Sequence, residues 1–280
     1  MSIKRFVFAA AMFACATGFA EVAVKNNDKI AFLGDSITYY GNNQPGGYVN
    51  LVMAGLSANG IKAHKLPAGI SGHKSNQMLE RLERSVLQHK PQIMLLSCGV
   101  NDVWHGAKRG VKLEDYRKNI TAIIDKAQAA GVKVCIMTAT MITENPGHAY
   151  NIKLKGYNDF LRQIAVEKKC MIADLNSDMQ KIIADFKKSN PGLQGSLLTN
   201  DGVHMNAWGD VMMASGILRA FGFNDAQMQK AQNAWRSKKV QVVKIMFTAD
   251  MIKKAAKQAA KNKMSIQEYI EFIIDNPPVK

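Results

Sequence analysis

The segment KIAFLGDSITYYG, residues 29–41, decides the fold that the sequence predicts. Residues 29–33 are apolar after the initial lysine and are typical of a short buried β-strand. Gly34 and Asp35 end the strand, and Ser36 begins a helix-like continuation. Gly34 and Asp35 either form a plain tight turn, which Asp35 stabilises by side-chain hydrogen bonds, or they place the Ser36 hydroxyl at a helix N-terminus for a chemical role. There, free N–H groups and the helix dipole stabilise an anion.

Short apolar runs alternate with longer helical patterns along most of the chain. Runs that are apolar throughout suit a sheet buried on both faces. Alternation at this spacing predicts right-handed βαβ units, and therefore a doubly wound α/β domain over about residues 25–222. The predicted strands are 29–33, 61–66, 92–98, 132–138 and 170–175, and the predicted helices lie near 47–59, 75–89, 114–130, 151–168, 177–188 and 207–221.

The first twenty residues have the composition of a secretory signal. Lys4 and Arg5 precede the apolar run FVFAAAMFACA, and Gly18 and Ala20 offer small residues for cleavage. The run is too short to cross a bilayer comfortably. Residues 1–20 therefore predict a cleaved signal peptide and a periplasmic or secreted protein. The weaker alternatives are a membrane anchor and a lipoprotein attached through Cys15.

Composition sets broad limits on the remaining chain. With 280 residues, 47% hydrophobic and 21% charged, the sequence is typical of a soluble globular protein. The net charge of +15 favours anionic partners such as nucleic acid, acidic polysaccharide or anionic lipid, although lysines spread along helices give the same balance without any ligand. Cys98, Cys135 and Cys170 are predicted to be buried free thiols, and their spacing does not match a zinc site.

Polar motifs follow the predicted strands at one edge of the sheet. In an open parallel α/β sheet, ligands bind outside the carboxyl ends of the strands. Gly, Ser, Asn, Asp and His gather at that edge, which makes it the candidate site. The motifs are GDS (34–36), PAGISGHKS (67–75), GVND (99–102) and NDGVHMNAWG (200–209).

Each of these residue types has a chemical role in acyl transfer. A serine needs a base, which His204 can supply, and Asp201, three residues earlier, can orient the imidazole. Gly72 can bring a backbone N–H close to a substrate, and Asn101 can add a side-chain N–H. Together with the N–H of Ser36 they would form an oxyanion hole, worth about 2.7–4 kcal/mol per donor.

The motifs GDSIT, GISG, GVND and DGVH, in this order, resemble the four blocks of the SGNH (GDSL-type) hydrolases over about residues 29–222. The resemblance implies a flavodoxin-like three-layer α/β/α sandwich with a five-stranded parallel sheet. It also implies ester hydrolysis that needs neither a metal nor a cofactor. In the family's pattern Ser36 is the nucleophile, Asp201 and His204 complete the triad, and Gly72 and Asn101 join Ser36 as oxyanion donors.

Several neighbouring residues leave alternatives open. Ile37 and Thr38 depart from the family pattern at its eponymous leucine, a position that does not touch the chemistry. His73, Trp104 and His105 sit beside the motifs and either line the pocket or are ordinary surface residues. The sequence has no G-x-S-x-G elbow, which argues against an α/β-hydrolase of the lipase type.

Residues 223–280 differ from the rest of the chain and hold eleven Lys or Arg against five Asp or Glu. A predicted strand at 240–247, a helix after Thr248 and a capping box SIQE at 265–268 give the order strand, helix, helix. This order resembles a ribbon-helix-helix module, usually a dimeric DNA binder, but that role conflicts with export. A tail that packs on the main domain, or that pairs two subunits as a homodimer, is favoured, and no nucleic acid partner is expected.

The combined prediction is an exported serine esterase that hydrolyses O-acyl esters. Export, and the lack of a long apolar insertion, favour O-acetyl groups on a carbohydrate. A lysophospholipase or thioesterase acting on longer acyl chains is the alternative. A further alternative is a binding module that keeps the fold but has no activity. The last alternative is a DNA-binding regulator. The regulator would retain residues 1–20, so mass spectrometry of the mature N-terminus distinguishes it from an exported enzyme.

Overall fold

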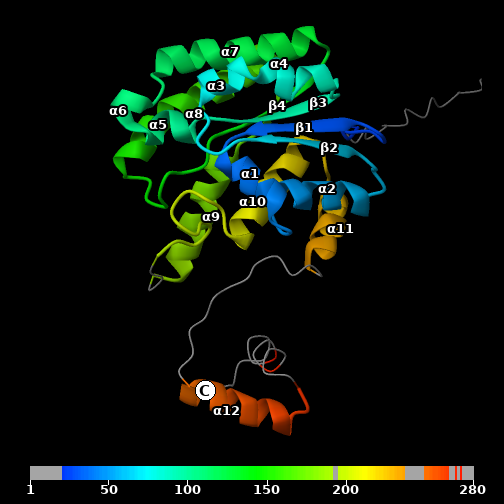
Figure 1. Cartoon of the computed structure of the whole chain (residues 1–280), viewed down its shortest axis with the longest axis vertical. Coiled ribbons are helices and arrows are strands. Elements are labelled where there is room, and N and C mark those ends of the chain that lie inside the picture. The colour runs from blue at the N-terminus through cyan, green and yellow to red at the C-terminus, as the bar shows by residue number, and fades with distance from the viewer. Residues whose placement is uncertain (1–20, 192–194, 237–248, 265–268, 270–271, 273–280) are drawn as a thin grey trace, which may run out of the picture. The chain divides into compact units, whose positions relative to one another are not determined.

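The computed structural model describes residues 21–191, 195–236, 249–264, 269 and 272 (Figure 1). The chain divides into two compact units, residues 1–241 and residues 242–280. In the second unit, helix α12 spans Ala249–Lys261, as the sequence predicts after Thr248. The signal segment 1–20, the predicted strand 240–247 and the capping box 265–268 lie outside the described residues.

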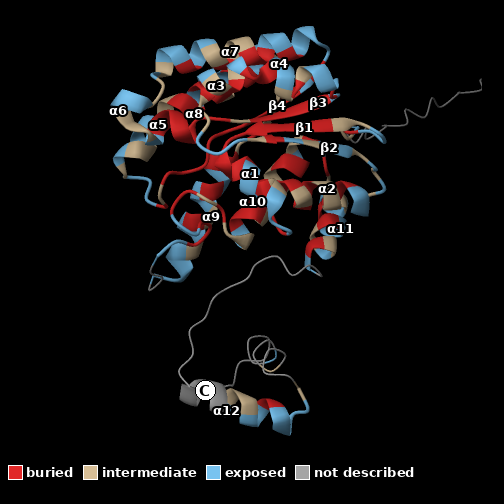
Figure 2. Ribbon diagram, in the orientation of Figure 1, coloured by how far each residue is buried: buried red, intermediate tan, exposed pale blue. Residues whose placement is uncertain are grey.

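A five-stranded parallel sheet forms the centre of the first unit. Its spatial order is β2-β1-β3-β4-β5, the order of flavodoxin-like folds, and the predicted fold class is confirmed. Residues 30–33 of β1 are almost completely buried because strands flank β1 on both sides and helices cover both faces (Figure 2). The strands are β1 (Lys29–Gly34), β2 (His64–Gly69), β3 (Ile93–Ser97), β4 (Lys133–Met137) and β5 (Met171–Ala173).

Helices cover both faces of the sheet and complete the three layers (Figure 1). One layer holds α1 (Ser36–Asn43), α2 (Tyr48–Ala58), α9 (Leu175–Ser189), α10 (Ala207–Ala220) and α11 (Asp225–Arg236). The other holds α3 (Ser75–Glu80), α4 (Leu82–Ser85), the 3-10 turn η1 (Leu87–His89), α7 (Leu113–Ala129) and α8 (Ala149–Glu167). The short helices α5 (Val100–Trp104) and α6 (Gly106–Arg109) follow β3.

Two predicted elements differ from the structure. Strand β2 begins three residues later than predicted, and it accommodates Pro67 because it is an edge strand. The predicted helix 75–89 is divided into α3, α4 and η1. The division falls at Arg81, whose backbone leaves the helical conformation while its side chain turns into the protein interior.

The predicted hydrolase domain ends at residue 222, but the first compact unit extends beyond this residue. Helix α11 packs on α2, and Ala231 and Trp235 are buried there against Gly55. The indole N–H of Trp235 donates a 2.9 Å hydrogen bond to the carbonyl of Leu51. This helix therefore belongs to the core of the α/β unit.

Cys98 and Cys135 are buried and Cys170 is half-buried, and all three are free thiols, as predicted. Burial raises the pKa of the Cys135 thiol to about 12. Within the described part of the chain, no helix has both the length and the apolar character needed to cross a membrane.

Replacing Trp235 tests whether α11 is part of the core. We expect Trp235→Ala to lower the free energy of unfolding by about 3–5 kcal/mol, because it removes a large buried side chain and leaves a cavity. Urea denaturation followed by circular dichroism measures the change. Lys230→Ala, at an exposed position of the same helix, is the matched control and should stay close to wild type. Equal stability of the two variants would contradict the assignment.

Candidate active site

The turn after β1 holds Ser36 by backbone geometry and one side chain. Asp35 is the N-cap of α1, and its Oδ1 accepts a 2.9 Å hydrogen bond from the N–H of Ile37, which confirms its predicted bracing role. Burial raises the pKa of Asp35 to about 7. A side chain at Gly34 would collide with the hydroxyl of Thr38, so glycine is required there. Ser36 thus occupies the first turn of α1 at the carboxyl end of β1.

Three of the predicted residues form a continuous hydrogen-bonded series. Ser36 Oγ lies 2.9 Å from His204 Nε2, and His204 Nδ1 lies 2.7 Å from Asp201 Oδ2. Asp201 Oδ1 also accepts the backbone N–H groups of Val203 and His204 at 3.0 and 2.8 Å. Burial by itself would raise the pKa of Asp201, but the hydrogen bonds from His204 and Val203 outweigh it and hold the pKa below its ordinary value. Asp201 is therefore a charged acceptor that fixes the imidazole.

A buried glutamate anchors the segment that leads into this loop. The carboxylate of Glu144 accepts the N–H groups of Leu197 and Leu198 at 2.6 and 2.7 Å and the hydroxyl of Thr199 at 2.8 Å. The N–H of Thr143 also donates to the carbonyl of Gly202 at 2.7 Å. The position of His204 therefore depends on the loop that follows β4.

The predicted oxyanion donors lie on the loops that follow the two strands flanking β1. Gly72, after β2, has a φ of +78°, a conformation that favours glycine, and a Cβ there would meet open space. Asn101, on α5 after β3, is buried and donates from Nδ2 to the carbonyl of His73 at 3.1 Å. The second N–H of the same amide is left for another acceptor.

Asp102 links the same two loops. Its Oδ1 accepts the N–H and the hydroxyl of Ser75 at 3.0 and 2.6 Å. Burial raises the pKa of Asp102 even though these hydrogen bonds oppose the shift. The loop that carries Gly72 is therefore attached to the loop that carries Asn101 at two points, through Asn101 and through Asp102.

Arg81 is a residue that sequence reasoning missed. Only 1% of its surface is exposed, and its Nη2 donates to the carbonyls of Gly34 and Ala68, both at 2.9 Å. Its Nε donates to His73 Nδ1 at 3.1 Å, so His73 takes part in this network as an acceptor. Burial, followed by the charges of Arg81 and Arg84, lowers the pKa of His73 and favours the neutral ring that this contact needs. An arginine in a helical pattern normally indicates solvent exposure, so the sequence carries no local signal for it.

Exposed aromatic side chains surround the site. Tyr40 packs edge-on against the His204 ring, with centroids 5.1 Å apart. Trp104, which the sequence leaves open as a pocket or surface residue, is exposed beside His105, as are Tyr39 and Tyr40. Within the described ranges, no cluster of three His, Cys, Asp or Glu side chains could hold a metal ion.

A flavodoxin-like sheet with serine, histidine and carboxylate at the carboxyl edge of its strands defines the SGNH class of serine hydrolases. The model of the GDSL-like lipase/acylhydrolase family matches residues 32–210, more than half of the sequence, and the chain belongs to this family. This membership confirms the predicted family and a carboxylic ester hydrolase activity.

Similar proteins agree with this class. An acetylxylan esterase from Geobacillus stearothermophilus is 25% identical over 220 residues, covering 71% of this chain and 96% of that protein. The crystal structure of the acetyl xylan esterase AlAXEase matches with a TM-score of 0.63 and 31% identity, over 69% of this chain and 98% of the other. Esterase TesA from Pseudomonas aeruginosa is 25% identical over 173 residues, 61% of this chain and 77% of that protein.

A pair of substitutions at His73 tests the Arg81 network. His73→Leu removes the acceptor for Arg81 Nε, and we expect a fall in kcat of about tenfold with little change in KM, because loop geometry is disturbed and not substrate binding. His73→Asn places an amide oxygen where Nδ1 accepts, so it should stay near the wild-type kcat. Steady-state hydrolysis of 4-nitrophenyl acetate measures both constants. Equal loss in the two variants, or an effect confined to KM, would show that the hydrogen bond is unimportant.

Proposed function

We propose that the protein is an exported serine esterase that removes O-acetyl groups from a carbohydrate. The observation that carries the proposal is the hydrogen-bonded series from Ser36 Oγ through His204 to Asp201. Family membership supports ester hydrolysis, and the two relatives described as acetylxylan esterases support an acetylated carbohydrate as the substrate class. Export rests on the composition of residues 1–20, and the mass of the mature N-terminus tests it.

In the proposed mechanism, His204 Nε2 takes the proton of Ser36 as Oγ attacks the ester carbonyl. His204 then gives that proton to the sugar oxygen, which leaves as an alcohol, and Ser36 keeps the acyl group. A water molecule gives a proton to His204 and attacks the acyl-enzyme. His204 returns this proton to Ser36 Oγ as that oxygen leaves, and the carboxylic acid is released. Asp201 holds the imidazole in one orientation and stabilises its charged form in both steps.

The negative charge on the attacked oxygen develops between three N–H donors. These are the backbone N–H groups of Ser36 and Gly72 and the free N–H of the Asn101 amide. Ser36 is also at the N-terminus of α1, where the helix dipole favours negative charge. The donors lie on loops already fixed by Arg81 and Asp102, so little reorganisation is needed when the charge forms.

Replacement of the serine tests the chemistry. We expect Ser36→Ala to lower kcat for 4-nitrophenyl acetate by at least about 10⁴-fold, because only binding and the oxyanion donors remain. The rate of 4-nitrophenolate release measures the loss. Circular dichroism spectra and melting temperatures that match wild type serve as the control for folding. A Ser36→Ala enzyme that keeps its full rate would exclude the proposed nucleophile.

A series of acyl lengths tests the substrate class. The second candidate is the lysophospholipase or thioesterase alternative, which would act on longer acyl chains. If the enzyme is a carbohydrate deacetylase, kcat/KM for 4-nitrophenyl esters should be highest at two carbons and fall steadily toward twelve. Acetate release from acetylated xylan, with Ser36→Ala as the control, should accompany it. A maximum at eight carbons or more, with no acetate release from the polysaccharide, would favour the second candidate.

A further inference from the structure

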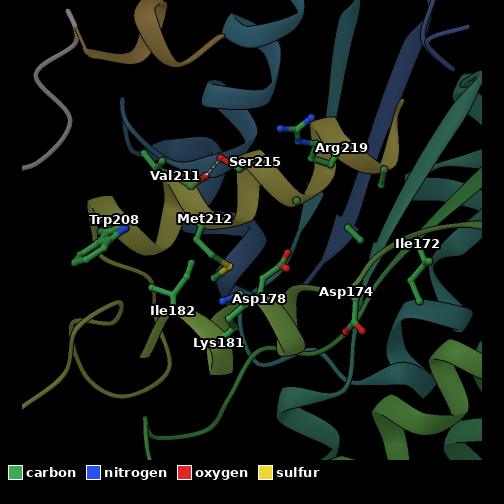
Figure 3. A pocket seen from close by; sticks show the side chains of 13 residues that line it. Ile172, Asp174, Asp178, Lys181, Ile182, Trp208, Val211, Met212, Ser215 and Arg219 are labelled. Carbon is green, nitrogen blue, oxygen red and sulfur yellow. Dashed lines mark hydrogen bonds between the residues drawn. The ribbon is translucent and has the colours of Figure 1, made fainter. Parts of the chain in front are cut away.

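A groove with a volume of about 550 Å³ lies between α9 and α10, beside the carboxyl end of β5 (Figure 3). None of Ser36, Asp201, His204, Gly72 or Asn101 lines it, so it is separate from the catalytic centre. It is nevertheless connected to that centre through the chain. Trp208, at one end of the groove, follows His204 by four residues, and Arg219 lies at the other end of the same helix.

Trp208 offers an accessible aromatic surface. Its side chain is 43% exposed, although large apolar side chains are ordinarily buried. Phe186 of α9 packs against it edge-on, with ring centroids 5.4 Å apart, and limits its motion. An indole face carries partial negative charge and attracts the slightly positive C–H groups of a sugar ring.

The second unusual group in the groove is the carboxylate of Asp178. Asp178 is exposed on α9, and no hydrogen-bond donor among the described residues reaches its carboxylate. Partial desolvation in the groove, and then the neighbouring carboxylate of Asp174, raises its pKa. Its Oδ2 faces Gly216 of α10 so closely that a Cβ there would lie only 3.0 Å away. A carboxylate that no protein donor contacts is left to water, so the hydroxyl groups of a ligand can take the place of that water as hydrogen-bond donors.

The other polar side chains of the groove are already engaged. Lys181 pairs with Asp185 at 2.5 Å, and Arg219 pairs with Asp225 at 2.5 Å. The hydroxyl of Ser215 donates to the carbonyl of Val211 at 2.7 Å, which leaves its oxygen as an acceptor. The groove therefore presents acceptors and an aromatic face, a combination that suits a ligand rich in hydroxyl donors and disfavours an anion or a bare acyl chain.

We propose that this groove is a second binding site for an uncharged oligosaccharide, which stacks on Trp208 and donates hydroxyl hydrogen bonds to Asp178. Trp208 and Gly216 are eight residues apart on α10, or about 12 Å along its axis, which exceeds one sugar ring. The inference rests on the proposed function, because the ligand is the unesterified backbone of the carbohydrate ester. Holding the backbone in the groove would raise the local concentration of its acetyl groups near Ser36.

Binding of sugars without ester groups tests this site directly. Isothermal titration with xylohexaose, cellohexaose and mannohexaose should detect binding of at least one. Trp208→Ala and Asp178→Asn should each weaken that binding by about tenfold or more, equal to about 1.4 kcal/mol. Ile152→Ala and Asp115→Asn, at exposed positions outside the groove, are the matched controls and should bind like wild type. No binding of any hexasaccharide, or undiminished binding by both groove variants, would overturn the proposal.

Kinetics distinguish failure of this site from failure of the proposed function. Asp178→Asn should raise KM for acetylated polysaccharide several-fold and leave the hydrolysis of 4-nitrophenyl acetate, which is too small to reach the groove, unchanged. An equal loss on both substrates would assign Asp178 to folding and overturn the groove site. If Ser36→Ala also keeps full activity, it is the proposed function that fails. A groove variant that changes the sedimentation coefficient and not sugar binding would identify a subunit contact in place of a glycan site.

Discussion

The buried guanidinium of Arg81 fixes three parts of the active site relative to one another. A charge with 1% exposure needs hydrogen-bond acceptors, and Nη2 and Nε of Arg81 find them at the ends of β1 and β2 and on the ring of His73. Nη1 has no acceptor among the described residues. One of these acceptors, the carbonyl of Gly34, belongs to the turn that presents Ser36. Another belongs to the loop that carries Gly72. Because a guanidinium is planar and rigid, it fixes the proposed nucleophile relative to a proposed oxyanion donor that follows a different strand.

The sheet order explains why these groups meet at all. Strand β1 lies between β2 and β3, so the loops after its neighbours flank the turn that carries Ser36. His204 is 168 residues away in the sequence and reaches Ser36 only because Glu144, after β4, holds the segment before the catalytic loop. The proposed catalytic centre is therefore built from loops that follow β1, β2, β3 and β5 and is braced by the loop after β4. This arrangement follows from the point at the centre of a doubly wound sheet where the strand order reverses.

The sequence predicts the parts of this structure whose causes are local. Strand 29–33 is apolar after Lys29, Gly34 and Asp35 mark a turn, and DGVH places a carboxylate within reach of a histidine. Arg81 and Glu144 were not predictable, because their roles depend on acceptors and donors distant in the chain. Helix α11 was missed for the same reason, since Trp235 is buried by packing against α2, which is distant in the sequence. Local pattern thus fixes the elements and the reacting groups, and long-range polar contacts fix their geometry.

A single segment connects the catalytic chemistry to the rest of the surface. Asn206 caps α10 by accepting the N–H groups of Trp208 and Gly209, so the helix begins three residues after His204. Trp208 therefore lies on a helix whose first residue is joined by a short segment to the loop that carries His204. Because Asp210 of the same helix also accepts the N–H of Tyr48 at 2.8 Å, α10 is attached to the layer that carries Ser36. A polymer bound along α10 would lie on a helix whose position relative to Ser36 and His204 is fixed. Under this condition, binding remote from the reacting bond can contribute to catalysis.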